Sequence, residues 1–168
     1  MSLLDLILKR WPLFAFVIAG VMLAIAHAFQ TFGGLPPCHL CLKQREVYWA
    51  ALPIAAAAGI SLFTPYALTG RRIGGAVLAI TFAYGAYLAG FHAGAEWKWW
   101  PAPETCASAK GSLAGVLALM HGEARATPAC DKAAWVFLGL SMAGWNFVAS
   151  VALVGLSIAS IFRPKDQR

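Results

Sequence analysis

Charged side chains are scarce in this sequence and are missing altogether from several long stretches. Only 12% of the 168 residues are Asp, Glu, Lys or Arg, about half the share usual in soluble domains, whereas 60% are hydrophobic. This composition excludes an ordinary water-soluble globule. The net charge of +6 falls mainly at chain ends and connections and leaves no basic face, so we expect no nucleic-acid partner.

Four uncharged stretches each approach the ~20 residues that a helix needs to cross a ~30 Å hydrocarbon layer. With their flanks they predict spans at about 11–31, 42–63, 73–92 and 143–162. The second is the shortest, and it spans only if it recruits flanking residues such as Leu42 or if the bilayer is locally thin. We predict an all-α membrane protein, a four-transmembrane-helix bundle forming one integral domain over residues 1–168. Small residues four positions apart favour close packing: Gly70 and Gly74, Gly85 and Ala89, Gly90 and Gly94.

Basic residues near the spans set the predicted orientation. Seven of the 13 lie in the N-terminus, the middle connection and the C-terminal tail: Lys9, Arg10, Arg71, Arg72, Arg163, Lys165 and Arg168. With an even number of spans these regions share one face, which the positive-inside rule assigns to the cytoplasm. The segments at about 32–41 and 93–142 then lie outside. Lys43 and Arg45 break this pattern, because they lie beside a span on the outer side. Their position therefore has to be explained by a local interaction.

All four cysteines lie in the two outer segments, at positions 38, 41, 106 and 130. Cysteines that serve only as small apolar side chains would be expected within the spans, since free cysteine is usually buried. Their placement away from the cytosol instead indicates disulfide chemistry in an oxidising compartment.

The first two cysteines form a Cys-x-x-Cys motif. Cys38 and Cys41 follow Pro36 and Pro37, which suit the start of a helix because a missing N–H is no loss there. Cys41 then lies near the positive end of a helix dipole, which favours the thiolate. Arg45 follows four residues later on the same helical face, where a cation stabilises the thiolate further and can hold an anionic oxygen beside it.

Three other uses of this motif are weaker. A structural zinc site calls for a second close-spaced pair, but Cys106 and Cys130 are 24 positions apart. A c-type haem site needs His directly after the second cysteine, where this chain has Leu42. A purely structural bridge between Cys38 and Cys41 closes a very small ring and gains little loop entropy. The sequence thus favours a redox couple, and no metal site is predicted.

The second pair lies in the long outer segment. Apolar residues at three- and four-residue spacing between its cysteines predict a short helix on the membrane surface: Leu113, Val116, Leu117 and Met120. Three tryptophans before it are typical of a membrane interface: Trp97, Trp99 and Trp100. Two disulfides in series can pass two electrons by thiol exchange from a soluble protein to a lipid-soluble acceptor, which suggests a quinone.

Three segments give the chain a resemblance to the DsbB family: PPCHLCLKQR (36–45), FHAGAEWKWWPAPETC (91–106) and CDKAAWVFLGLSMAGWN (130–146). DsbA, DsbB and quinone keep the bacterial periplasm oxidising. The resemblance therefore implies a multi-pass protein of the bacterial inner membrane, with both termini cytoplasmic and the cysteine segments in the periplasm. It also implies a quinone-dependent protein-disulfide oxidoreductase.

The resemblance carries over to individual cysteines. Cys106 would be attacked by the reduced partner, a DsbA-like periplasmic thioredoxin-fold protein, and Cys130 would then attack Cys38. Cys41 would leave as a thiolate and pass electrons to a quinone of the membrane pool, either ubiquinone or menaquinone. Arg45 would steady the sulfur and the quinone oxygen.

Two further residues complete the expected cofactor-binding set. His92, at the outer end of the third span, matches a quinone-proximal histidine of the family, and Glu96 lies one turn further along. Two alternatives stay open at this point. One is a b-type haem carrier with His27 and His92 as axial ligands, and the other is a VKOR-type quinone reductase with the same chemistry.

Overall fold

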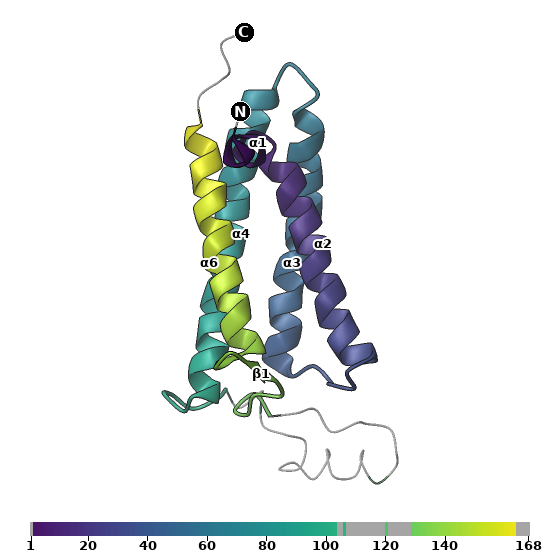
Figure 1. The fold of residues 1–168 in the computed structure, drawn as a ribbon, viewed down its shortest axis with the longest axis vertical. Coiled ribbons are helices and arrows are strands. Elements are labelled where there is room, and N and C mark those ends of the chain that lie inside the picture. Colours follow the sequence, from purple (N-terminus) through teal and green to yellow (C-terminus); the bar gives the residue numbers. More distant parts are fainter. Residues whose placement is uncertain (1, 104–105, 107–119, 121–128, 164–168) are drawn as a thin grey trace.

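The structure is a computed structural model that describes residues 2–103, 106, 120 and 129–163. Its elements are α1 (Leu3–Lys9), α2 (Trp11–Thr31), α3 (His39–Ser61), α4 (Ala67–Glu96), β1 (Val136–Phe137), β2 (Leu140–Ser141) and α6 (Met142–Phe162). The four long helices run side by side along the molecule (Figure 1). The start of the chain and the end of α6 share one end of the bundle, and the β1–β2 hairpin lies at the other. The predicted helical class is confirmed.

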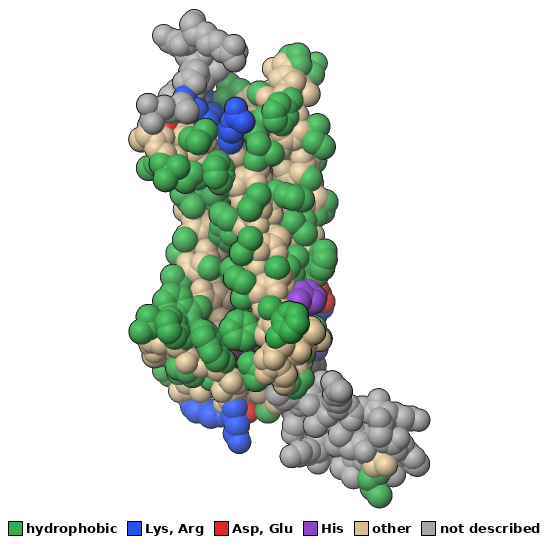
Figure 2. Space-filling view, turned by 45° about the vertical axis from the view of Figure 1, so that its right-hand side comes forward, with side chains coloured by type: hydrophobic (Ala, Val, Ile, Leu, Met, Phe, Trp, Pro, Cys, Tyr) green, Lys and Arg blue, Asp and Glu red, His purple; other side chains and the backbone are tan. Residues whose placement is uncertain are grey.

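Three helices in the described part of the chain are long and apolar enough to cross a membrane, namely α2, α4 and α6. α3 is 23 residues long, but its first turns carry Lys43, Arg45 and Glu46. It is not among the helices whose hydropathy and low number of charged residues suit a membrane span. Figure 2 shows the charged side chains gathered near the two ends, with a mainly hydrophobic and uncharged surface between them. These features support a multi-pass membrane protein, whereas the fourth span stays a prediction.

The helix bounds differ from the predicted ones in ways that local chemistry explains. α4 has 30 residues and contains the expected span 73–92 with extra turns at both ends. The added helix α1 begins with a capping box, in which the N–H of Asp5 donates to Ser2 Oγ and the N–H of Ser2 donates to the Asp5 carboxylate. The hairpin, also not predicted, turns at Leu138 and Gly139, both with positive φ, as tight two-residue hairpin turns require.

The three basic regions meet at one end of the bundle, as the charge pattern predicts. The Arg71 guanidinium, from the start of α4, donates a hydrogen bond to the backbone carbonyl of Arg163 after α6. The Arg163 side chain forms an ion pair with Asp5 of α1. The N-terminus, the middle connection and the start of the C-terminal tail are therefore joined directly.

Close helix approach depends on small residues. α3 and α4 meet where Gly74 faces Ala58, so closely that a Cβ added to Gly74 would lie 2.3 Å from the Ala58 Cβ. α2 and α6 are joined by a buried hydrogen bond of 2.9 Å from Trp11 Nε1 to Ser157 Oγ. The buried hydrophobic cluster around these contacts consists of Trp11, Ala15, Ala19, Leu23, Tyr48, Ala51, Ala55, Leu78, Phe82 and Leu153.

The Gly74 contact yields a stability prediction. Gly74→Ala should lower stability by ~1–3 kcal/mol, because the new methyl overlaps Ala58 and forces α3 and α4 apart. Gly20→Ala is the matched control, since a Cβ there meets nothing within 4 Å, and it should be neutral or stabilising. Apparent melting temperatures in detergent would test both changes. Equal melting temperatures for the two variants would contradict the proposed close contact.

Candidate functional site

The Cys-x-x-Cys motif forms the first turn of α3. Cys38 is the N-cap residue, and its Sγ accepts a hydrogen bond of 3.2 Å from the N–H of Cys41. Cys38 is buried and Cys41 half-buried, and both are free thiols. The helix start predicted from Pro36 and Pro37 is therefore confirmed, with a sulfur in the place where Ser or Asp usually caps a helix.

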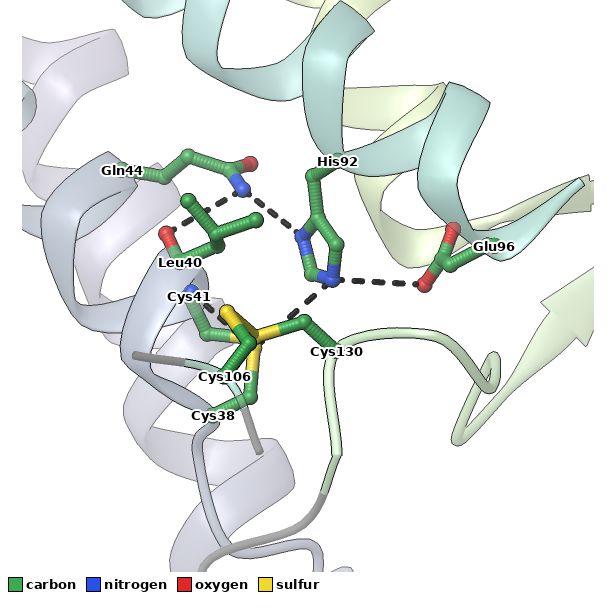
Figure 3. Close-up of a disulfide and its surroundings, with 8 residues drawn as sticks. All are labelled: Cys38, Leu40, Cys41, Gln44, His92, Glu96, Cys106 and Cys130. Carbon is green, nitrogen blue, oxygen red and sulfur yellow. Dashed lines mark hydrogen bonds and ion pairs between the residues drawn. A yellow bond between two sulfur atoms is a disulfide. The ribbon is translucent and has the colours of Figure 1, made fainter. Parts of the chain in front are cut away.

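The other two cysteines form a disulfide that lies against this turn. Cys106 and Cys130 are bonded to each other and are only 4% and 1% exposed. They belong to one buried cluster with Cys38 and Leu40, at the end of the bundle where α3 begins (Figure 3). The fold thus brings together two cysteine pairs that are distant in sequence.

Contacts from the segment after α4 hold the disulfide in place. The Lys98 ammonium donates to the Asp131 carboxylate at 2.6 Å and to its backbone carbonyl at 2.7 Å, next to Cys130. The Lys98 hydrogen bond also lowers the pKa of Asp131. Trp100 folds back on α4, where its Nε1 donates to the carbonyl of Phe91 at 2.9 Å. The role at the membrane interface that was predicted for Trp100 stays a prediction. In the structure its indole fixes the segment after α4 against the end of that helix.

His92 lies at the centre of the site (Figure 3). It is 4% exposed, and its Nε2 is 3.7 Å from Cys38 Sγ and 3.7 Å from Glu96 Oε1. Glu96 in turn accepts a hydrogen bond from the Ser141 hydroxyl, at the start of α6. The structure therefore brings His92, predicted from the family resemblance, into contact with the cysteine motif, and Glu96, predicted from its position one helical turn later, into contact with His92.

A chain of buried and part-buried hydrogen bonds continues from His92 into the bundle. Gln44 Nε2 lies 3.0 Å from His92 Nδ1 and also donates to the carbonyl of Leu40 at 3.3 Å. Asn146 Nδ2 donates to Gln44 Oε1 at 2.6 Å, and the Tyr48 hydroxyl donates to Asn146 Oδ1 at 2.5 Å. Our sequence analysis missed Gln44 and Asn146. Asn146 had a signal, because it is an amide in an otherwise apolar helical stretch, whereas Gln44 is flanked by the charged residues Lys43 and Arg45 and gave none.

Arg45 lies one turn after Cys41, as predicted. Its guanidinium donates to Gln30 Oε1 at 2.6 Å and to the carbonyl of Ala26 at 2.9 Å, which ties α3 to the end of α2. Both acceptors are neutral, so neither cancels the positive charge. Lys43, the other charge that broke the topology pattern, instead pairs with Glu46 at 2.9 Å on the exposed surface.

A cavity of about 450 Å³ opens beside these groups. Cys41, Arg45, His92 and Glu96 all line it, and apolar side chains make up most of the remaining wall. Its size falls within the range of ~300–1,000 Å³ that is common for small-molecule sites. The predicted cofactor-binding residues thus share one cavity with the second cysteine of the motif.

The two thiols of the motif differ in acidity. The pKa of Cys41 is lowered, chiefly by a hydrogen bond from the Cys38 thiol, and Arg45 adds a smaller lowering. The pKa of Cys38 is raised by the same hydrogen bond and by burial. Cys41 is therefore the sulfur that carries the negative charge in the reduced pair.

Two metal-based alternatives can be compared with this geometry. A four-cysteine zinc site is not formed, because Cys106 and Cys130 are bonded to each other. For the haem alternative, His92 is buried in the site, but His27 packs edge-on against Trp49 and does not line the cavity. The described residues do, however, place the ligand atoms of Cys38, Cys41 and His92 within 4.8 Å of one another.

Comparison with known proteins agrees with this arrangement. The family model described as disulfide bond formation protein DsbB matches residues 8–160. The chain belongs to the DsbB family. Membership makes it a membrane oxidoreductase of disulfide bond formation, which supports this activity over the haem-carrier and VKOR-type alternatives.

Relatives within the DsbB family match along most of their length. Disulfide bond formation protein B of Albidiferax ferrireducens is 34% identical over 93% of this chain and 90% of its own. Proteins of the same name from Polaromonas sp. and Methylococcus capsulatus are 30% and 29% identical, over 88% and 87% of this chain and 86% and 89% of their own. No solved structure matches the chain significantly.

The acidity of Cys41 can be tested by alkylation. In a Cys106→Ser/Cys130→Ser variant with the motif reduced, the rate at Cys41 should rise with pH around a midpoint below the ~8.5 of an unperturbed thiol, because its thiolate is stabilised. Mass spectrometry after timed labelling would separate Cys41 from Cys38. A midpoint for Cys41 at or above that of Cys38 would reverse the assignment.

Proposed function

We propose that this DsbB-family chain oxidises the dithiol of a DsbA-like periplasmic thioredoxin-fold protein and passes the two electrons to a quinone of the membrane pool. The observation that carries the proposal is the packing of the Cys106–Cys130 disulfide against Cys38, next to a cavity lined by Cys41 and Arg45. Thiol exchange needs sulfurs in close contact, and reduction of a membrane acceptor needs a cavity beside the last sulfur.

The sulfur chemistry balances as a sequence of exchanges. A thiolate of the partner attacks Cys106, forms a mixed disulfide and releases Cys130 as a thiolate. Cys130 attacks Cys38 when the Cys38–Cys41 disulfide is present, which forms a Cys38–Cys130 bond and releases Cys41 as a thiolate. The second thiol of the partner then attacks the mixed disulfide, so that the partner leaves oxidised and Cys106 is left reduced. Cys106 attacks Cys130 in the Cys38–Cys130 bond, which restores the loop disulfide and releases Cys38. Re-forming the Cys38–Cys41 bond then gives up the two electrons and two protons that the quinone would accept.

The cavity suits a quinone head group in size and in chemistry. When bound, a quinone supplies an acceptor for two electrons and two protons. Arg45 would hold a ring oxygen by a charge-assisted hydrogen bond, and the same cation stabilises the Cys41 thiolate. His92 and Glu96, which line the same cavity, are the groups that would exchange protons there. The residues fit both ubiquinone and menaquinone.

The arrangement of charges supports a topology for this single domain over residues 1–168. We place the cysteine end in the periplasm and both termini in the cytoplasm of the bacterial inner membrane, because Arg71 and Arg163 meet at the other end. α3 would be the fourth span. It packs against α2 and α4 (Figure 1). Its charged residues are confined to its first turns, at the end that we place in the periplasm. The surface helix predicted between Leu113 and Met120 lies mostly outside the described residues and stays a prediction.

The experiment that tests the function is quinone-dependent oxidation of a reduced thioredoxin-like protein by the purified chain. Cys41→Ser should abolish turnover. Arg45→Leu should raise the KM for quinone by roughly 10- to 100-fold, the equivalent of a lost charge-assisted hydrogen bond. Lys43→Leu is the control, since Lys43 pairs only with exposed Glu46 among the described contacts, and its KM should not change. An unchanged KM in Arg45→Leu would remove Arg45 from the quinone site.

The order of the sulfurs can be tested by trapping. In Cys130→Ser, Cys106 has no internal disulfide partner and is a free thiol. It should attack the disulfide of the oxidised partner protein, which releases one partner thiol and leaves a mixed disulfide that Cys130 can no longer resolve. Non-reducing electrophoresis would detect it as a reducible adduct. Cys106→Ser is the control and should give no adduct. An adduct that forms through Cys130 in Cys106→Ser would exchange the roles of the two cysteines.

A further inference from the structure

We propose that reduction of the Cys38–Cys41 pair creates a binding site for a thiophilic divalent cation such as Zn²⁺. Cys38, Cys41 and His92, whose ligand atoms lie within 4.8 Å of one another, would be the ligands (Figure 3). Glu96, next to His92, would turn in as the fourth. The site requires only that the pair can be reduced, and it does not depend on which quinone or partner protein the chain uses. It would be a state-dependent inhibitory site within the redox centre.

The distances suit a tetrahedral ion. Zinc bonds of about 2.3 Å to sulfur and 2.0–2.1 Å to nitrogen place the two ligand atoms ~3.6 Å apart. Cys38 Sγ and His92 Nε2 are 3.7 Å apart, and Cys41 Sγ completes a group that lies within 4.8 Å. The oxygen of a tetrahedral site should lie ~3.4 Å from the nitrogen, and Glu96 Oε1 is 3.7 Å from His92 Nε2. Small shifts would therefore bring Cys38 and His92 onto one ion, whereas Glu96, which lies outside the group of atoms within 4.8 Å, would have to turn toward the sulfurs to become the fourth ligand.

The ligand types and their surroundings also suit zinc. Two cysteines separated by two residues at a helix start are a common half of a zinc site, and histidine and carboxylate are its other usual ligands. Cys38 and His92 are both nearly inaccessible to water, which keeps competing water ligands away. The cavity beside Cys41 gives an ion a path to the site. The loop disulfide cannot compete, because its sulfurs are bonded.

The hydrogen-bond chain behind His92 can adapt to an ion. An ion on Nε2 of His92 requires the ring proton to be on Nδ1, so Nδ1 becomes a hydrogen-bond donor. In the structure Nδ1 faces the NH₂ group of Gln44, which is also a donor. Turning the Gln44 amide over would present its oxygen instead, at the expense of the bond to the Leu40 carbonyl. Asn146 and Tyr48 can reverse their hydrogen bonds as well, because an amide and a hydroxyl each carry a donor and an acceptor. Ligating histidines usually have such a partner.

The ion would be coupled to the redox state of the pair. Its binding to the dithiol forms two metal–sulfur bonds and releases the thiol protons. Oxidation of Cys38 and Cys41 to a disulfide, with two electrons passing to an acceptor such as the quinone, removes both thiolates and releases the ion. Bound zinc would therefore hold the pair reduced and slow turnover until a chelator removes it.

Metal titration of the purified full chain in detergent would test this inference. In a Cys106→Ser/Cys130→Ser background, only Cys38 and Cys41 can supply thiolates. After reduction and anaerobic removal of the reductant, competition with a chromophoric chelator should show one Zn²⁺ bound per chain. After oxidation of the pair, no ion should bind. Cd²⁺ should add a thiolate-to-metal absorption band only in the reduced protein.

Three variants identify the ligands. His92→Phe should weaken Zn²⁺ binding at least 10-fold, whereas His39→Phe, which changes the exposed histidine between the two cysteines, should have no effect. Gln44→Glu should strengthen binding by up to about 10-fold, because a carboxylate accepts the Nδ1 proton without an amide rotation. A gain in affinity cannot come from misfolding. Gln44→Glu therefore still tests whether His92 is a ligand, even if His92→Phe does not fold.

Zinc uptake that persists after oxidation, or that is lost in His39→Phe and kept in His92→Phe, would overturn the inference. So would a reduced protein that binds Zn²⁺ no better than a Cys38→Ser/Cys41→Ser variant. Quinone-linked oxidation measured separately with metal-free wild-type protein would be unaffected by these results. Failure of the metal site and failure of the proposed function are therefore distinguishable.

Discussion

Satisfied hydrogen bonds around one buried imidazole hold the redox end of this bundle together. His92 comes from α4, Gln44 from α3 and Asn146 from α6. Asn146 donates a hydrogen bond to the Gln44 side-chain oxygen, and the Gln44 nitrogen is hydrogen-bonded to His92 Nδ1. A buried polar group without a partner costs about 1–3 kcal/mol, so the three helices are restricted to the register in which these groups meet. That register also brings His92 to Cys38, which places the sulfur chemistry at a fixed point on the protein.

The sequence was sufficient for features that depend on composition and short spacing. Apolar stretches located α2 and α6 closely, and Pro36 and Pro37 located the start of α3. It was not sufficient for the hairpin or for α1, because two-residue strands and a helix of about two turns leave almost no periodic signal. The Gln44–Asn146 bond was also out of reach, since residues 102 positions apart meet only once the helix register is known.

α3 shows how charged residues near a candidate site change the composition of a long helix. Lys43, Arg45 and Glu46 lower the mean hydropathy of its first turns. For this reason α3, unlike α2, α4 and α6, is not apolar enough to count as a candidate span. Arg45 is held by neutral groups of α2, so its charge is available to the neighbouring sulfur and to the cavity. Of the three charges that lower the hydropathy of α3, Arg45 is the one that lines the cavity, whereas Lys43 and Glu46 pair with each other on the exposed surface.

The capping of α3 by Cys38 links bond chemistry to secondary structure. The sulfur that accepts the N–H of Cys41 is the one to which the proposed exchange assigns a new covalent partner. A sulfur engaged in a disulfide is a weaker acceptor than a free thiol. Forming and breaking a bond at Cys38 would therefore change how firmly the first turn of α3 is capped, which would link the oxidation state of the pair to the start of a helix that packs against α2 and α4.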